Sequence, residues 1–229
     1  MEKMKTAPIF ITATGTGVGK TLLAALLAAR LRQDGVRVTA LKPVSSGDRE
    51  DARQLAVALG GSLSLDEINP WHFRDAVAPV LAARRERQRV TGVQIISHIR
   101  NLQKRCDQLL IEGAGGLLSP LGERVDSRDL IMALRARPVI VALNQLGMVN
   151  LLRLTLGALS PAIRKQAVVV LMSPEKPDAS TRSNEALLAE YFDWDRIIPF
   201  PRLGNPGALE MTLKIRPVRQ ALSRIIELA

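Results

Sequence analysis

The chain has 229 residues, of which 47% are hydrophobic and 24% charged, and its formal net charge at pH 7 is +10. This composition, without an apolar run near the roughly 18 residues of a membrane span, predicts a soluble globular protein with one domain over residues 1–229. Cys106 is the only cysteine, which excludes an intrachain disulfide and a multi-cysteine zinc site. We expect its side chain to be a small buried hydrophobe.

The positive charge is compatible with nucleic acid, an anionic membrane or a phosphorylated ligand as partner. The arginines are scattered apart from one run at 84–89, and aromatic residues make up only 3% of the chain, so bases would find few rings to stack on. We therefore expect a solvated basic surface, with neither nucleic acid nor membrane as partner. The apolar stretch near the amino terminus is short and leads into a glycine loop rather than a cleavage site, so we expect a cytoplasmic location.

Short apolar runs rich in β-branched residues alternate with helical patterns along the chain. We expect strands at 8–13, 36–44, 107–113, 138–144, 167–172 and 196–200, and helices at 20–35, 50–61, 127–136, 148–159, 183–192 and 215–229. Because these runs are apolar throughout, the pattern predicts an α/β fold with a doubly wound, mostly parallel sheet flanked by helices. Residues 62–89 are expected to form loops and short helices over one edge. The amphipathic segment at 215–229 is expected to pack on the core.

The first junction between a strand and a helix reads TATGTGVGKT, at residues 12–21. Its glycines permit a tight reversal whose backbone N–H groups close around an oxyanion, while Lys20 reaches the terminal phosphates and the Thr21 hydroxyl is placed for Mg²⁺. The fit to G-x-x-x-x-G-K-[ST] is imperfect, because Thr14 occupies the place of the first glycine. The segment predicts a P-loop NTPase-like fold with nucleotide contacts from Gly15, Thr16, Gly17, Val18, Gly19, Lys20 and Thr21.

Metal ligands for a nucleotide-dependent reaction are expected at the carboxyl ends of the parallel strands, the edge that carries the glycine loop. Glu112 closes the apolar run at 107–113, and Asp51 follows the second strand, with Asp48 and Glu50 as its rivals. Mg²⁺ typically takes one or two carboxylates together with phosphates and waters. Thr21, Asp51 and Glu112 would therefore suffice as its protein ligands.

Lys42 stands at the end of the second predicted strand, just before Pro43. A second lysine beside a phosphate site suits stabilisation of a phosphoryl group in transfer or of a carboxylate being phosphorylated, and the alternative is a surface lysine. Residues 112–121 form a second glycine loop at a strand end, which allows close approach of backbone to a ligand. We therefore add Glu112 and Gly113 to the expected nucleotide contacts.

Six segments occur together in an order typical of one family: TATGTGVGKT, LKPVSSG, NPWHF, IEGAGGLLSPL, PVIVAL and LGMVNLLRLTLGAL. Together they resemble dethiobiotin synthetases, the ATP-dependent cyclo-ligases of biotin synthesis, over most of the chain. The conjunction is specific, because other P-loop families share only the first segment.

The resemblance implies a homodimer that uses ATP and Mg²⁺ to join CO₂ to the two neighbouring amines of 7,8-diaminopelargonate, through a carbamate and a carbamic-phosphoric mixed anhydride. It implies that Lys20 and Lys42 bracket the carbamate and phosphoryl oxygens, and that Thr16 and Ser46 contact the reacting group. It also implies that one helix start receives the tail carboxylate of the substrate across the dimer interface, through Gly147, Met148, Val149 and Asn150.

Some positions depart from the pattern of that family. Val80 and Leu151 stand where the family often has histidine, which removes two hydrogen-bonding side chains. Met172, Ser173 and Pro174 stand where the family has an asparagine-centred segment that reads adenine. Loss of the amide is expected to loosen the choice of base, because a site selects a polar ligand through matched donors and acceptors. Residues 199–207 are a further candidate for the base pocket.

Two alternatives stay open. A diverged P-loop ligase or amidoligase would activate another carboxylate with ATP, although amidoligases of this type usually carry a glutaminase domain with a catalytic cysteine, and Cys106 lies in a helical pattern. A ParA or MinD-like ATPase switch would bind DNA, membrane or a protein partner. The basic charge favours the switch, but Thr14 and Gly15 stand where those proteins carry an additional lysine.

Overall fold

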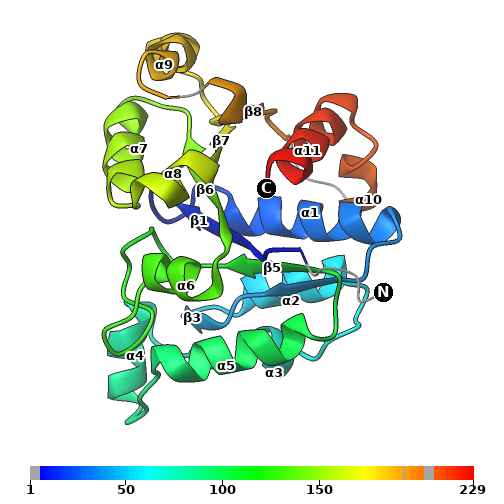
Figure 1. Cartoon of the computed structure of the whole chain (residues 1–229), viewed down its shortest axis with the longest axis vertical. Coiled ribbons are helices and arrows are strands. Elements are labelled where there is room, and N and C mark those ends of the chain that lie inside the picture. Colours follow the sequence, from blue (N-terminus) through cyan, green and yellow to red (C-terminus); the bar gives the residue numbers. More distant parts are fainter. Residues whose placement is uncertain (1–5, 193, 204–208) are drawn as a thin grey trace.

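Six parallel strands form the main sheet of the computed structural model, which describes residues 6–192, 194–203 and 209–229 (Figure 1). The strand order is β2-β5-β1-β6-β7-β8. Each of the six predicted strands corresponds to a strand of this sheet, although the one predicted at 36–44 is shorter than expected: β1 Ile9–Ala13, β2 Val38–Leu41, β5 Gln108–Glu112, β6 Arg137–Leu143, β7 Val168–Met172 and β8 Ile197–Phe200.

Helices cover both faces of this sheet, as the sequence predicts for a doubly wound fold. One hydrophobic core contains side chains of α1, α2 and α11, and the other contains side chains of α4, α5, α6 and α7. The helices are α1 Lys20–Gln33, α2 Glu50–Ala58, α3 Leu65–Ile68, α4 Pro79–Arg85, α5 Gly92–Gln103, α6 Ser127–Leu134, α7 Met148–Gly157, α8 Pro161–Gln166, α9 Ala179–Ala189, α10 Leu209–Thr212 and α11 Arg216–Leu228. A 3₁₀ turn, η1, spans Trp194–Arg196.

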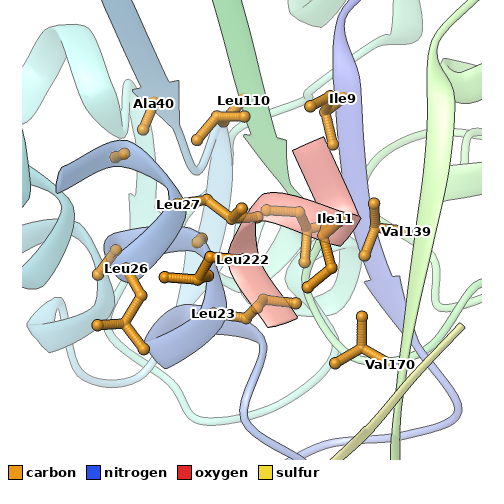
Figure 2. Close-up of a cluster of buried hydrophobic side chains, with 14 of the residues drawn as sticks. Ile9, Ile11, Leu23, Leu26, Leu27, Ala40, Leu110, Val139, Val170 and Leu222 are labelled. Atoms are coloured by element: carbon orange, nitrogen blue, oxygen red, sulfur yellow. The ribbon is translucent and has the colours of Figure 1, made fainter. Parts of the chain in front are cut away.

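Successive residues of the central strand β1 face opposite cores, because side chains alternate along a strand. Ile9 and Ile11 belong to the core under α1, whereas Phe10 belongs to the other. Figure 2 shows Leu23 of α1 and Leu222 of α11 beside Ile11, in the first of these cores. This burial on both faces explains why the strands lack polar alternation.

The carboxy-terminal helix α11 buries its apolar side and lies beside α1 (Figure 1). Val218, Leu222 and Ile225 are fully buried in the core. The expectation that this amphipathic segment packs on the core is therefore confirmed. Among the helices of the described ranges, none has the length and apolarity needed to cross a membrane.

The predicted strand at 36–44 is wrong in its extent, because two strands occupy it. β2 ends at Leu41, and β3, Val44–Ser46, pairs in parallel with β4, Trp71–Phe73, in a separate two-stranded sheet. Pro43 lies between β2 and β3 and has no N–H to donate to a ladder, while the N–H of Lys42 donates to the carbonyl of Ile68. The chain therefore leaves the main sheet at Lys42.

Residues 62–89 contain the expected short helices, α3 and α4, but also β4, which the sequence pattern did not indicate. The helix α5 was not predicted either. A local signal for it exists, because Thr91 and Gln94 form a capping box at its start: the Thr91 side chain accepts from the Gln94 N–H, and the Gln94 side chain accepts from the Thr91 N–H. Cys106 is buried, as expected.

Candidate functional site

Three neighbouring strands of the main sheet deliver the predicted site residues to one edge. β1 runs into the glycine loop, β5 ends at Glu112, and β2 leads into Lys42. In the register of the sheet, Ile11 of β1 lies opposite Glu112 of β5. A cavity of about 750 Å³ opens at this edge, and the predicted site residues that line it are Thr16, Gly17, Gly19, Lys20, Thr21, Lys42, Ser46, Asp51 and Glu112.

The glycine loop adopts a backbone that ordinary residues rarely take. Gly17 and Gly19 have φ angles of 74° and 102°, in the left-handed region. A Cβ on Gly19 would also lie 2.9 Å from Cε of Met172, so a side chain there would meet β7. Gly19 is the N-cap of α1, and the loop therefore presents the first N–H groups of that helix to the cavity.

Lys20 is held over this loop. Its Nζ donates to the carbonyl oxygen of Gly15 at 3.0 Å, and the residue is 6% exposed. Burial lowers the pKa of Lys20 below its ordinary value, although the nearby Glu112 opposes this shift. Gly15 thus contributes its carbonyl to the loop without lining the cavity, and Val18 packs against the core instead.

Glu112 joins the loop to Lys42. It is 1% exposed, and its Oε1 accepts from Thr21 Oγ1 at 2.7 Å and from Lys42 Nζ at 2.9 Å. Lys42 also forms an ion pair with Asp51. Burial lowers the pKa of Lys42, but Glu112 and Asp51 outweigh it and raise the pKa above its ordinary value. For the Asp51 carboxyl, burial acts in the opposite direction and raises the pKa. The charge of Lys42 and the hydrogen bonds from Lys42 and Thr21 outweigh burial and hold the pKa below its usual range.

The oxygens gathered here fit Mg²⁺. Thr21, Asp51 and Glu112 supply a hydroxyl and two carboxylates, which are hard donors, and Oε2 of Glu112 is buried without a hydrogen-bond partner. No group of three acidic, histidine or cysteine residues in the described ranges could hold a metal by itself. A magnesium ion at this place would therefore need phosphate oxygens to complete its coordination.

Two further segments line the cavity. Ser46 ends β3, and its hydroxyl donates to the carbonyl of Val77. The loop before α4 therefore closes one side of the cavity. The second glycine loop closes another through Gly115, which has a φ of 68°. Gly113 lies outside the lining, where a Cβ would come within 2.6 Å of Ser127 Oγ, so this glycine permits close packing.

The segment predicted to receive a carboxylate tail forms the start of α7, outside the lining of this cavity. Gly147 is the N-cap, with a φ of 88°, and Met148 is buried whereas Asn150 is exposed. β6 ends at Leu143, so α7 begins at the same edge of the sheet as the cavity. Three leucines beside it are exposed to solvent: Leu146, Leu151 and Leu154.

The positions that depart from the family pattern lie outside the lining of the cavity. Val80 is in α4, and Leu151 is 47% exposed on α7. Met172 ends β7 beside Gly19, and the hydroxyl of Ser173 donates to the carbonyl of Phe200 at 2.9 Å. Of the other candidate for the base pocket, residues 199–207, residues 204–207 lie outside the described ranges.

The sequence reasoning missed Asn69 and Arg49, which bond to the backbone and side chains next to Lys42. Asn69 is fully buried and donates to the carbonyl of Lys42, and Arg49 donates to Asn69. Asn69 falls in the NPWHF segment. The signal that could have drawn attention to it is a polar amide directly before a proline and an apolar run.

Comparison with known proteins gives a consistent picture. A family described as an AAA domain matches residues 7–206. The ATP-dependent dethiobiotin synthetase BioD of an Anaeromyxobacter species is 38% identical over 186 residues, which cover 79% of this chain and 83% of that protein. The protein of the same name from Bacillus licheniformis is 34% identical over 207 residues, which cover 88% of this chain and 86% of that protein.

Among solved structures, the cell division ATPase MinD of Pyrococcus furiosus matches with a TM-score of 0.58 at 17% identity. The match covers 98% of this chain and all of that one. At this identity the likeness shows the fold alone: a P-loop NTPase-like arrangement of a parallel sheet and its helices.

Proposed function

The chain belongs to the ATP-dependent dethiobiotin synthetase family, and on this premise we propose which residues carry out the reaction. The protein is an ATP-dependent ligase that forms carbon–nitrogen bonds, and its product is dethiobiotin, in biotin biosynthesis. One observation carries the assignment of residues. Two buried lysines, Lys20 and Lys42, meet Thr21, Asp51 and Glu112 around one cavity at the glycine loop.

In the proposed reaction, CO₂ adds to one amine of 7,8-diaminopelargonate, and the amine loses a proton to give a carbamate. A carbamate oxygen attacks the γ-phosphorus of ATP, ADP leaves, and a carbamic-phosphoric mixed anhydride forms. The second amine attacks the carbamoyl carbon, loses a proton and expels inorganic phosphate, which closes the cyclic urea. These steps need positioning and charge neutralisation more than covalent help from the protein.

The glycine loop and Lys20 bind the polyphosphate in this proposal. Backbone N–H groups at the start of α1 point into a cavity that already contains the Lys20 ammonium, so negative oxygens are favoured there. Lys42 and Ser46 enter the cavity from the next strand end and would contact the carbamate, with Thr16 on the loop side. Charge that develops on the phosphoryl and carbamate oxygens would then lie between two ammonium groups.

Thr21, Asp51 and Glu112 would hold Mg²⁺. When bound, the ion would offset negative charge on the phosphate oxygens and favour their displacement. The unpartnered Oε2 of Glu112 supports this role, because a buried carboxylate oxygen without a partner is costly to the fold. The protein residues themselves orient the phosphates relative to Lys42.

A homodimer is the proposed assembly, with the tail carboxylate of the substrate bound at the start of α7. Gly147, Met148, Val149 and Asn150 lie at a helix N-terminus, which favours a carboxylate. The N–H of Met148 already donates to the carbonyl of Gln145, so the N–H groups of the other three residues would bind the tail. Exposed leucines cluster beside these residues, and an apolar patch at a surface is typical of a protein interface.

Turnover of ATP tests the assignment. The purified chain is supplied with ATP, MgCl₂, ¹³C-bicarbonate and 7,8-diaminopelargonate, and phosphate release and dethiobiotin mass are followed. We expect one phosphate per dethiobiotin and one ¹³C in the cyclic urea, and neither with Lys20→Ala. Stimulation of ATP turnover by DNA or by anionic vesicles, without stimulation by the diamine, would instead identify an ATPase switch. The likeness to MinD does not favour that alternative, because it establishes only the fold.

A further inference from the structure

Asn69 follows the short helix α3 and is completely buried. Its Nδ2 donates to the carbonyl oxygen of Lys42 at 2.7 Å. The N–H of Lys42 donates in turn to the carbonyl of Ile68 at 3.0 Å. Both backbone polar groups of Lys42 are therefore held by one turn, residues 68–69, and this fixes the point from which the Lys42 side chain begins.

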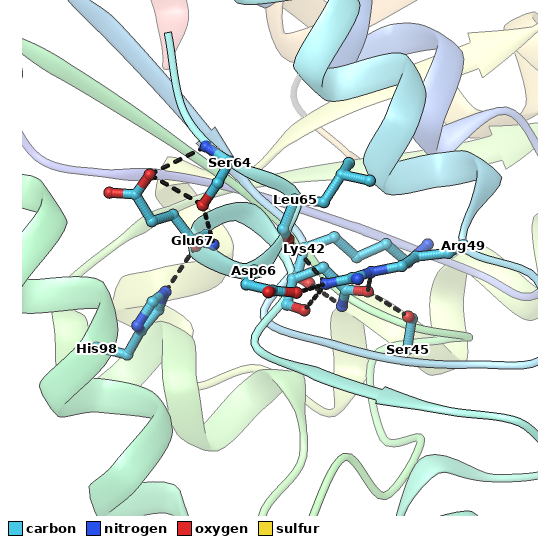
Figure 3. A network of polar contacts seen from close by, with 9 residues as sticks. Lys42, Ser45, Arg49, Ser64, Leu65, Asp66, Glu67 and His98 are labelled. Carbon is cyan, nitrogen blue, oxygen red and sulfur yellow. Dashed lines mark hydrogen bonds and ion pairs between the residues drawn. The ribbon is translucent and has the colours of Figure 1, made fainter. Parts of the chain in front are cut away.

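The same turn holds the start of α2 through Arg49. Nε of Arg49 donates to Oδ1 of Asn69 at 3.2 Å, and Nη2 donates to the carbonyl oxygen of Asn69 at 2.7 Å. Arg49 is the N-cap of α2, whose first turn carries Asp51, the ion-pair partner of Lys42. Figure 3 shows Lys42 and Arg49 together with Ser45 at this turn. Asn69 thus contacts the backbone of Lys42 and the N-cap residue of the helix that carries Asp51.

From this arrangement we infer that Asn69 is a positioning residue of the ligase: through the Lys42 carbonyl and through Arg49, it sets how the Lys42 ammonium lies relative to Asp51. The inference rests on the proposed function, because the reaction gives that ammonium its task. Asn69 does not line the cavity, so it acts through Lys42 and not on the substrate.

An amide is required at this position because its donor and its acceptor are both used. Oδ1 accepts from Arg49 and also from Ser45 Oγ, at 2.9 Å, while Nδ2 serves Lys42. An aspartate would keep both acceptor contacts, and would pair with the Arg49 guanidinium, but it would turn an oxygen toward the Lys42 carbonyl. Asn69→Asp therefore removes the contact with Lys42 while it preserves the contact with Arg49.

The outer side of the same turn provides a matched control. Ser64 caps α3 in a capping box with Glu67, and the ring of His98 contacts the carbonyl of Glu67 at 2.8 Å (Figure 3). None of these three residues lines the cavity. Ser64→Ala therefore weakens the anchoring of α3 without a direct effect on Lys42.

The test compares the full-length wild-type chain with Asn69→Asp and Ser64→Ala. We measure kcat, the KM for the diamine, the Kd of a non-hydrolysable ATP analogue by calorimetry, and the thermal midpoint. For Asn69→Asp we expect kcat to fall by about 10- to 100-fold with an unchanged Kd for the analogue, because a small displacement of a reacting group is that costly. For Ser64→Ala we expect a lower thermal midpoint with kcat unchanged.

A second readout needs no turnover. Acetic anhydride is used in limiting amounts, and mass spectrometry gives the rate of acetylation of Lys42 relative to Lys20. We expect this ratio to rise several-fold in Asn69→Asp, because the Lys42 ammonium is no longer held against Asp51. In Ser64→Ala we expect the ratio to stay at the wild-type value. If the wild-type chain forms no dethiobiotin, the proposed function fails, and this ratio still decides the inference.

The inference would be overturned if Asn69→Asp kept the kcat and the labelling ratio of the wild type. It would also be overturned if both variants lost kcat equally, because that result marks a purely structural residue. If Asn69→Asp does not fold, Arg49→Lys takes its place. A lysine retains the charge near Asp66 but cannot contact both Oδ1 and the carbonyl of Asn69. We then expect a lower kcat with an unchanged Kd for the analogue, and wild-type kcat would overturn the inference.

Discussion

The ammonium of Lys42 lies 2.9 Å from Oε1 of Glu112, a carboxylate 70 residues away in the chain. Both side chains are almost completely buried, and Lys42 also pairs with the more exposed Asp51. These two carboxylates are the proposed ligands of Mg²⁺. Lys42 and the metal would therefore share the same two carboxylates, and the lysine would give up part of this contact when it turns toward a carbamate.

Lys42→Ala is expected to impair the chemical step while nucleotide binding stays largely intact. Lys20 and the loop N–H groups would bind the phosphates, and the Lys42 side chain does not hold them in place. The loss in kcat should be about 10²- to 10³-fold, as for removal of one group that stabilises developing charge. Single-turnover kinetics and calorimetry with an ATP analogue measure the two quantities. A pure loss of nucleotide affinity would count against the assigned role.

Lys42→Met is expected to raise the affinity for a divalent cation in the absence of nucleotide. Without the Lys42 ammonium, Glu112 and Asp51 lose the cation that pairs with both of them and keep only the weaker influence of Lys20, so a metal ion would relieve their repulsion. Titration with Mn²⁺ followed by electron paramagnetic resonance reports this affinity directly. Arg219→Met, on the exposed face of α11, removes one positive charge elsewhere and serves as the control. Equal affinities in both variants would argue against carboxylates shared by the lysine and the metal.

CTP and GTP are expected to replace ATP better here than in relatives that have the asparagine. Met172 offers only a weak acceptor, and the Ser173 hydroxyl already donates to Phe200, so neither side chain can donate a strong hydrogen bond to a base. Values of kcat/KM for the three nucleotides, under identical metal and diamine concentrations, provide the comparison. A strict preference for ATP would place base recognition in other residues.

A dimer is expected in solution, with the exposed leucines of α7 in its interface. Leu154 is 65% exposed, and a charge at an apolar interface is poorly tolerated because it would be buried without a partner. Sedimentation equilibrium should give twice the chain mass of 25.0 kDa for the wild type and a single chain mass for Leu154→Asp. Leu187→Asp, on the partly exposed side of α9, is the matched control. A wild-type monomer would refute the proposed assembly.

Stability at acid pH is expected to depend on Asp178. Hydrogen bonds from the Ser180 hydroxyl and the Leu146 N–H, among others, lower the pKa of its exposed carboxyl from 3.8 to about 2. A lowered folded-state pKa stabilises the fold fully above the unfolded value of 3.8, and the contribution disappears as pH falls toward about 2. The contact with Leu146 ties α9 to the segment before α7, so the start of α7 should loosen with it.

Asp178→Asn gives the comparison, because asparagine still caps a helix but does not titrate in this range. Denaturant unfolding between pH 2 and 6 should show a constant difference from wild type above about pH 4 and a shrinking difference below it. A difference that persists unchanged to pH 2 would show that the carboxylate charge has no part in it.

Local patterns in the sequence determined the six strands of the main sheet, most of the helices that flank it and the glycine loop itself, but not the small sheet of β3 and β4. Strands buried on both faces are apolar throughout, and helices repeat their apolar positions every three or four residues, so these elements are visible without any contact being known. The turn at residues 12–21 is equally local, because its glycines, Lys20 and Thr21 are neighbours in the chain. The resemblance of the whole chain to the dethiobiotin synthetase family also rested on short local segments, six of them in a typical order.

Only the tertiary structure decided how the distant residues combine. Glu112 reaches Thr21 and Lys42 because the parallel register of β2, β5 and β1 brings their ends together, and register is a property of strand pairing and not of any one strand. Asn69 bonds to Lys42 because the chain leaves the main sheet before Pro43 and enters β3, which pairs with β4 just after Asn69. A buried amide and the carbonyl that it satisfies carry no periodic signal, so no pattern in the sequence could link them.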